Sequence, residues 1–196
     1  MMQQIYRRIA RMAVRIWRWK HFNGFGIQSP TDYAFVCNIV YGRAYREASA
    51  LPETLRRDKT VRGRIGSLLY RIADFWKPDC IGNSMSDADY YSSFLFAAVS
   101  SELIVQTPDF DSQAKRVIYC LSPQVLTEEK QVQDLLSHAG DGCVVLVDGT
   151  SQRHIYNKVW KRLVQDDRVR SSFDLYDVGI AFFDPKRVKQ HYKINF

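Results

Sequence analysis

The stretch GCVVLVDGT, residues 142–150, carries an unbroken apolar run that ends at an acid and a glycine. A run of this kind, without polar alternation, is typical of a strand buried on both faces of a parallel sheet. Comparable short runs lie around Ile81, Ile104 and Ile118, and stretches with helical periodicity separate them. This alternation of strand and helix predicts an α/β fold with a doubly wound, mostly parallel sheet.

The segment SSFDLYDVGIAFFD, residues 171–184, has a different pattern. Two apolar runs flank turn-forming residues at 177–179, which predicts two strands joined by a turn. We therefore expect an antiparallel hairpin over 173–183 to close the otherwise parallel sheet.

The N-terminal segment is strongly basic and contains no acid before Asp32. Its basic residues are Arg7, Arg8, Arg11, Arg15, Arg18 and Lys20. On a helix the arginines gather on one face, beside an apolar stripe that consists of Ile5, Ile9, Met12, Ile16 and Trp19. We predict that protein covers the stripe, either within the chain or in a homodimer, and that the arginines are solvated. The alternatives are contact of this helix with an anionic membrane surface or with nucleic-acid phosphates.

The next segments predict two further helices and a linker. The Ser-Pro pair at 29–30 is typical of a helix start, with serine as N-cap and proline at the first helical position. Residues 46–60 are charged and weakly periodic, which predicts a linker or loop, and a third helix is expected from Val61. The predicted organisation is a basic helical extension with its linker over 1–60, followed by an α/β domain over 61–196.

Composition limits the class of protein. With 196 residues, 46% of them hydrophobic, the chain is long enough for one sizeable core. No apolar run approaches the roughly 20 residues of a membrane span, and the basic start lacks the apolar stretch of a signal peptide. The four cysteines and four histidines are scattered and form no zinc-binding pattern. We therefore predict a cytoplasmic protein without a metal site.

Four stretches carry a family resemblance: GFGIQSP at 24–30, FWKPDCIGNS at 75–84, CVVLVDGTSQ at 143–152 and DLYDVGIAFFDPKRVKQHYKINF at 174–196. Together with the predicted layout of the sheet, they resemble a bacterial subgroup of the class I S-adenosylmethionine-dependent methyltransferases. The first and last are the most specific, because the fold does not dictate their sequences. The resemblance implies a Rossmann-like, methyltransferase-type sheet that ends in an antiparallel hairpin, in a shortened form with fewer units in the middle.

The resemblance also implies where S-adenosylmethionine would bind. In the family, an acid, a glycine, a hydroxylated residue and a second glycine follow one another at the end of a strand. An acid after the next strand binds the ribose. This sequence has Cys80 at the first acidic position and Ser86 at the second glycine. The cofactor-binding candidates are Gly82, Asn83, Ser84 and, at the ribose position, Gln106.

Both carboxylates of that family site are therefore replaced. An amide such as that of Gln106 binds a hydroxyl more weakly than a carboxylate does. We expect residues 82–84 to form the turn between a buried strand and a helix, with Ser86 or Asp87 capping the helix. We predict an affinity for S-adenosylmethionine far below that of an intact site.

Asp148 is the catalytic candidate, because it matches the acidic position at the carboxyl end of a late strand in the family. There it would orient a substrate or act as a base. The alternative is that Asp148 makes the turn or caps the helix that starts near Ser151. No carboxylate follows at 149–151, so we do not expect the metal-assisted form of the reaction.

Two functional hypotheses follow. The first is a small methyltransferase with an altered cofactor loop, and the second is a methyltransferase-like protein with little or no activity that serves as a binding or interaction module. A third places the function in the basic N-terminal helix, through a membrane surface or nucleic acid. The substrate stays open in each case.

Overall fold

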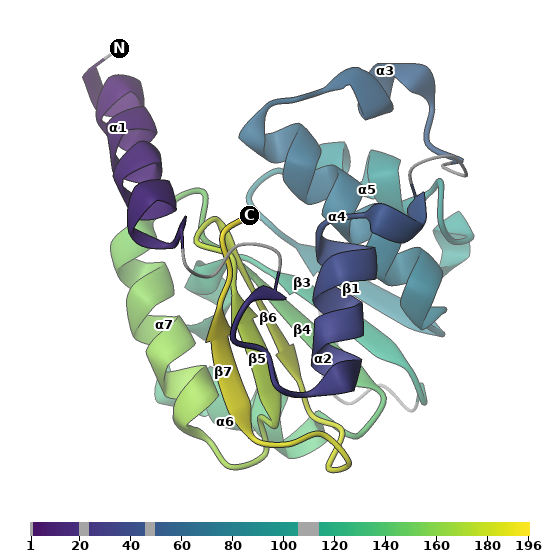
Figure 1. Cartoon of the computed structure of the whole chain (residues 1–196). Coiled ribbons are helices and arrows are strands. Elements are labelled where there is room, and N and C mark those ends of the chain that lie inside the picture. The colour runs from purple at the N-terminus through teal and green to yellow at the C-terminus, as the bar shows by residue number, and fades with distance from the viewer. Residues whose placement is uncertain (1, 20–23, 46–49, 106–113) are drawn as a thin grey trace.

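A mixed sheet of seven strands lies at the centre of the molecule (Figure 1). The computed structural model describes residues 2–19, 24–45, 50–105 and 114–196. The strands are β1 (Cys80–Ser84), β2 (Ile104–Val105), β3 (Val117–Leu121), β4 (Cys143–Asp148), β5 (Ser171–Asp174), β6 (Val178–Phe182) and β7 (Gln190–Lys193). Their order across the sheet is β2-β1-β3-β4-β6-β5-β7.

The pairing of the strands confirms the predicted sheet. β1 pairs in parallel with β2 and β3, and β3 pairs in parallel with β4. β6 is antiparallel to both β4 and β5, so the predicted hairpin is present and β6 lies between β4 and β5. β7, which we did not predict, pairs in parallel with β5 at the edge of the sheet.

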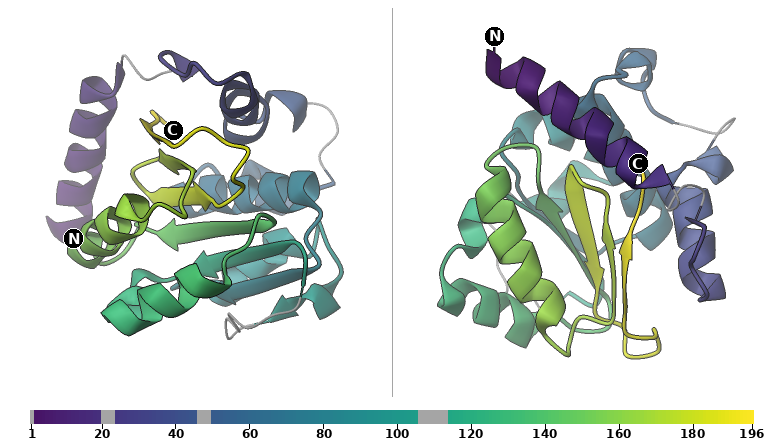
Figure 2. Two further views of the ribbon diagram at one scale, coloured as in Figure 1. Left: turned by 90° about the horizontal axis from the view of Figure 1, so that it is seen from below. Right: turned by 60° about the vertical axis from the view of Figure 1, so that its left-hand side comes forward.

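Helices cover both faces of this sheet (Figure 2). They are α1 (Met2–Trp17), α2 (Pro30–Phe35), the π-helical turn η2 (Val36–Val40), α3 (Glu53–Arg57), α4 (Val61–Trp76), α5 (Ala88–Leu95), α6 (Glu129–His138) and α7 (Arg153–Gln165). Short 3-10 turns add η3 (Arg43–Tyr45), η4 (Ser101–Leu103) and η5 (Pro123–Leu126). The predicted helices at the N-terminus, after Ser29 and from Val61 are confirmed. Residues 46–60 are not only a loop, because they contain α3.

Two apolar clusters fill the layers. One lies between the sheet and α2, η2, α4 and α5, and it includes Phe35, Leu69 and Ile118. The other lies between the sheet and α6 and α7, and it includes Val145 and Trp160. Successive residues of β4 enter opposite clusters, which is why this strand has no polar face.

The helix that begins at Pro30 belongs to the core. Ser29 Oγ accepts a hydrogen bond from the backbone N–H of Asp32 at 3.3 Å, as predicted for an N-cap. Phe35 and Ile39 then pack in the same apolar cluster as α4. Residues 30–40 are therefore integrated with the sheet, although the division at residue 60 placed them in an extension.

Within one chain, helix α1 has the opposite orientation from the one we predicted, and cover of its apolar stripe by a second copy stays a prediction. Ile9, Met12 and Ile16 of the predicted apolar stripe are 60%, 64% and 74% exposed, whereas Arg18 is buried. The arginine face turns inward because the carboxyl edge of the sheet offers carboxylates and backbone carbonyls as partners. In Figures 1 and 2 the second half of α1 lies close to the C-terminal residues. The side chains of Ile5, Arg7 and Arg8 lie outside the described part of the chain.

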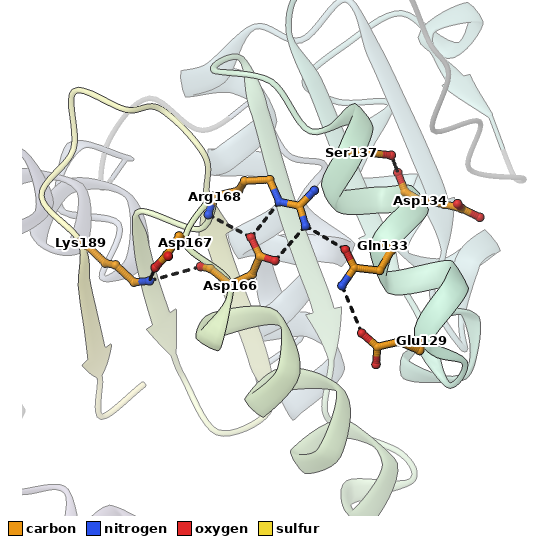
Figure 3. A network of polar contacts seen from close by, with 8 residues as sticks. All are labelled: Glu129, Gln133, Asp134, Ser137, Asp166, Asp167, Arg168 and Lys189. Carbon is orange, nitrogen blue, oxygen red and sulfur yellow. Dashed lines mark hydrogen bonds and ion pairs between the residues drawn. The ribbon is translucent and has the colours of Figure 1, made fainter.

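A polar network ties the loop after α7 to its neighbours (Figure 3). The Arg168 guanidinium bonds both carboxylate oxygens of Asp166 at 2.8 Å and donates to Gln133 of α6 at 2.9 Å. These hydrogen bonds lower the pKa of Asp166. Lys189, just before β7, bonds the carboxylate of Asp167. The network fixes the starts of β5 and β7, at the end of the sheet away from the carboxyl ends of the parallel strands.

Candidate functional site

The carboxyl ends of the parallel strands form one side of a pocket of about 770 Å³. The loops after β1 and β4, the start of α4, the inner face of α1 and the residues after β7 surround it. Its lining includes Arg11, Arg15, Arg18, Lys59, Thr60, Arg62, Arg64, Ser86, Asp87, Thr150, Ser151, Tyr176, Asp177, Asn195 and Phe196. This edge of an open α/β sheet is the usual place for a ligand.

Three arginines of this pocket are paired with acids. Arg11 Nε lies 2.9 Å from Asp177, and Arg62 Nε lies 2.9 Å from Asp87. Arg18 bonds Asp174 at 2.7 Å through both its carboxylate and its backbone carbonyl. Burial raises the pKa of Asp177, although the charge of Arg11 opposes this shift.

Three further cations of the pocket, Lys59, Arg15 and Arg64, form no ion pair with an aspartate or a glutamate of the described residues. Arg15 donates to the backbone oxygen of Phe196 at 3.4 Å, and the Arg64 guanidinium lies 4.6 Å from the centre of the Phe196 ring. Burial and the charge of nearby Arg15 lower the pKa of Arg64. The pocket is therefore strongly electropositive.

The cofactor-loop candidates do not form the turn that we predicted. Gly82 is paired in register with Val105 and Tyr119, and β1 continues to Ser84. The turn lies over 85–87 because β3 pairs with β1 as far as Ser84. Cys80, assigned to the acidic position at the strand end, is instead the first residue of β1.

Asn83 is buried, and its side chain makes hydrogen bonds within the segment that follows β1. The amide donates to the Ala88 carbonyl and to Ser92 Oγ, both at 3.0 Å, and its oxygen accepts from the Met85 N–H at 3.4 Å. These bonds hold the turn against the start of α5. Asp87 occupies the predicted N-cap position, but its side chain pairs with Arg62 and makes no capping hydrogen bond. Gln106 lies outside the described residues.

Asp148 ends β4 and is fully buried. Its Oδ1 accepts from the Thr150 N–H at 2.7 Å and from Thr150 Oγ1 at 2.6 Å, so this oxygen stabilises the turn after the strand. In the described part of the chain, Asp148 Oδ2, Ser84 Oγ and the Tyr91 hydroxyl are buried without a hydrogen-bond partner. Burial and the charge of Asp148 raise the pKa of Tyr91.

The structure brings the two predicted loops together. Ser86 Oγ, after β1, lies 3.0 Å from Ser151 Oγ, after β4. Our sequence analysis missed that the inner face of α1 and the start of α4 complete the same pocket. The spacing of Arg11, Arg15 and Arg18 revealed a common face of the helix, but not which way that face points.

Comparisons of the chain with protein-family models, curated proteins and solved structures find no match. Within the described residues, no group of three or more histidines, cysteines and acids is arranged to hold a metal ion. None of the described helices has the length and apolar character needed to cross a membrane.

Proposed function

We propose that this chain is a methyltransferase-like binding module with little or no methyl transfer activity. The strand order supports the family resemblance, because a hairpin strand inserted antiparallel beside a parallel sheet is the layout that the resemblance implies. Among the described residues, the short β2 is the one strand beyond β1, as expected for a shortened member.

The observation that carries the proposal is the chemistry at the end of β1. None of the residues of β1 is acidic, and the Asn83 amide is engaged with Ala88 and Ser92. Asp148 holds its own turn. The pocket in front of these loops is lined by guanidinium groups, which repel a cation such as the sulfonium of S-adenosylmethionine.

Thermal unfolding with and without S-adenosylmethionine and S-adenosylhomocysteine tests this proposal. A ligand that binds the native state raises the melting temperature. We expect no shift with either compound at micromolar concentration. Adenosine serves as the control for weak binding of the base and ribose alone. A rise with S-adenosylhomocysteine that adenosine does not reproduce would overturn the proposal.

We propose as a second candidate that α1 contacts an anionic membrane surface. The specific observation is the exposure of the apolar side chains on and just after this helix, namely Tyr6, Ile9, Met12, Ile16, Trp17, Trp19 and Phe25. A helix with one apolar face and aromatic residues at one end suits the interface between headgroups and acyl chains. The net charge of +7 favours anionic lipid. Nucleic-acid contact is less favoured, because Arg11 and Arg18 are paired with acids.

Sedimentation with lipid vesicles tests this candidate. We expect binding to phosphatidylcholine vesicles that contain phosphatidylglycerol, and its loss in the double variant Ile9→Ser, Ile16→Ser. Val188→Ser is the matched control, since Val188 is an exposed apolar residue far from α1 in sequence. Equal sedimentation of the double variant and the native chain would contradict the candidate. So would a dimer in light scattering that the double variant abolishes, because a second copy would then cover this face.

A further inference from the structure

The pocket at the carboxyl edge of the sheet has more positive charge than its own acids neutralise. It is lined by six cations, Arg11, Arg15, Arg18, Lys59, Arg62 and Arg64, and by two acids, Asp87 and Asp177. Three of these cations, Arg11, Arg18 and Arg62, form ion pairs with aspartates. The other three, Lys59, Arg15 and Arg64, form no ion pair with an aspartate or a glutamate of the described residues. Like charges held together in a partly buried site favour the binding of an anion.

The start of α4 adds to this preference. The helix is 16 residues long and has no acid in its first turn, and just before it the Asp58 carboxylate accepts from the Thr60 N–H at 2.8 Å. Its N-cap Thr60 accepts from the Gly63 N–H at 3.1 Å, and Thr60, Val61 and Arg62 of this helix start line the pocket. Free N–H groups and the helix dipole at an N-terminus both stabilise an anion.

A second, independent observation concerns Arg18. Its side chain is 5% exposed, it lines the pocket, and its Nε is buried without a hydrogen-bond partner in the described chain. Burial and the charge of Arg15 lower the pKa of Arg64, because both disfavour the charged form of its guanidinium. An anion bound beside Arg15 and Arg64 would offset the repulsion between these two cations.

We propose that this pocket binds a phosphate-bearing anion through Arg15, Arg64 and the start of α4. A guanidinium presents two parallel N–H donors that match two phosphate oxygens, and three unneutralised cations suit a multivalent anion better than a single carboxylate. An adjoining pocket of about 630 Å³ shares Arg15, Lys59, Arg64 and Phe196 and adds Trp19 and Tyr41. Its aromatic side chains would accept the apolar or ring portion of an organic phosphate.

Calorimetric titration with inorganic pyrophosphate tests the proposal. We expect binding at low ionic strength that weakens as salt is added. The variants Arg64→Gln and Arg15→Gln should each weaken binding roughly tenfold or more, as loss of a charge-assisted hydrogen bond predicts. Arg15→Gln should disturb the fold less than Arg64→Gln, because the Arg15 side chain is exposed and makes one long hydrogen bond of 3.4 Å. Arg57→Gln, an exposed arginine on α3, is the control and should bind as the native chain does.

Lipid arms separate the two sources of phosphate. If soluble pyrophosphate displaces the protein from vesicles that contain phosphatidic acid, the site binds a lipid headgroup. If pyrophosphate binds but does not compete with these vesicles, the site binds a soluble phosphate. The ligand class rests on the proposed function, because the same pocket would otherwise hold the cofactor. Failure of pyrophosphate to bind, or equal binding by all three variants, overturns this inference alone. Binding of S-adenosylhomocysteine at this pocket overturns the proposed function.

Discussion

Asp32 and Arg187 form a buried ion pair across 155 residues of sequence, with 2.5 Å between Asp32 Oδ1 and Arg187 Nη1. Their side chains are 1% and 9% exposed. The Tyr192 hydroxyl donates to the other carboxylate oxygen at 3.3 Å, and the Arg187 guanidinium lies 4.1 Å from the centre of the Phe182 ring. The pair joins the helix that follows the GFGIQSP block to the C-terminal segment, so the two most specific parts of the family resemblance meet in space.

Asp32→Ala should therefore destabilise the fold strongly. Removing one partner of a buried pair leaves the other charge uncompensated and typically costs about 3–5 kcal/mol. Urea unfolding followed by circular dichroism measures this loss. Glu53→Ala is the control, because its exposed pair with Arg57 on α3 should contribute only about 0.3–0.5 kcal/mol. Equal losses in the two variants would show that the buried pair does not anchor the C-terminal segment.

The strand segments and the mostly parallel sheet could be predicted because buried parallel strands have a distinctive composition, whereas their order across the sheet was not predicted. Val144–Val147 has no polar face, and the pattern around Gly179 marks the hairpin. β7 was missed because it lacks such an apolar run. In this edge strand Tyr192 is buried while Gln190, His191 and Lys193 are exposed, so no apolar run marks it.

The sequence indicated which strand ends lie at the candidate site, but not which other residues line it. The resemblance directed attention to residues 82–84 and to Asp148, and the loops that follow their strands do meet at Ser86 and Ser151. The orientation of α1 was not predictable, because helical periodicity shows that Arg11 and Ile9 lie on different faces but not which face has partners. The partners, Asp174 and Asp177, come from the far end of the chain.

Close packing between α4 and α5 predicts a second effect on stability. A Cβ on Gly66 would lie 2.4 Å from the ring of Phe94, a fully buried side chain of α5. Gly66→Ala should lower the free energy of unfolding by about 1–3 kcal/mol through overpacking, despite the better helix propensity of alanine. Gly140→Ala, with no atom within 4 Å of the added Cβ, should change it by less than about 0.5 kcal/mol. A neutral Gly66→Ala would contradict this packing.

The role of Asp148 in its turn predicts a difference between two variants. Asp148→Ala removes the acceptor of two Thr150 hydrogen bonds and should cost about 1.5–3 kcal/mol in unfolding free energy. Asp148→Asn keeps an oxygen acceptor for Thr150, so it should lower the free energy of unfolding clearly less. It also removes the negative charge of a buried carboxylate whose Oδ2 has no hydrogen-bond partner in the described chain. Thermal and urea unfolding of both variants check this. Equal destabilisation would indicate that the carboxylate charge, and not the turn, matters.

His191 predicts a dependence of stability on pH. His191 is exposed on one side, but its partial burial and the charge of Lys189 lower its pKa, and its Nδ1 lies 2.8 Å from Ser172 Oγ. The unfolded chain therefore binds more protons than the native one below the ordinary histidine pKa, and stability falls as pH drops through that region from about 6.5. Unfolding free energies from pH 8 to pH 5 should fall more for the native chain than for His191→Gln. Parallel pH profiles would contradict the prediction.

The proposal that the carboxyl-edge pocket is not a cofactor site is tested most directly by calorimetric titration with S-adenosylhomocysteine. Each charge-assisted hydrogen bond that is absent costs about 1.5–3 kcal/mol, so two absent carboxylates weaken binding roughly a hundredfold or more. We predict no heat of binding in the micromolar range of ligand. Tight binding of one molecule per chain would contradict the account and restore an active methyltransferase as the better description.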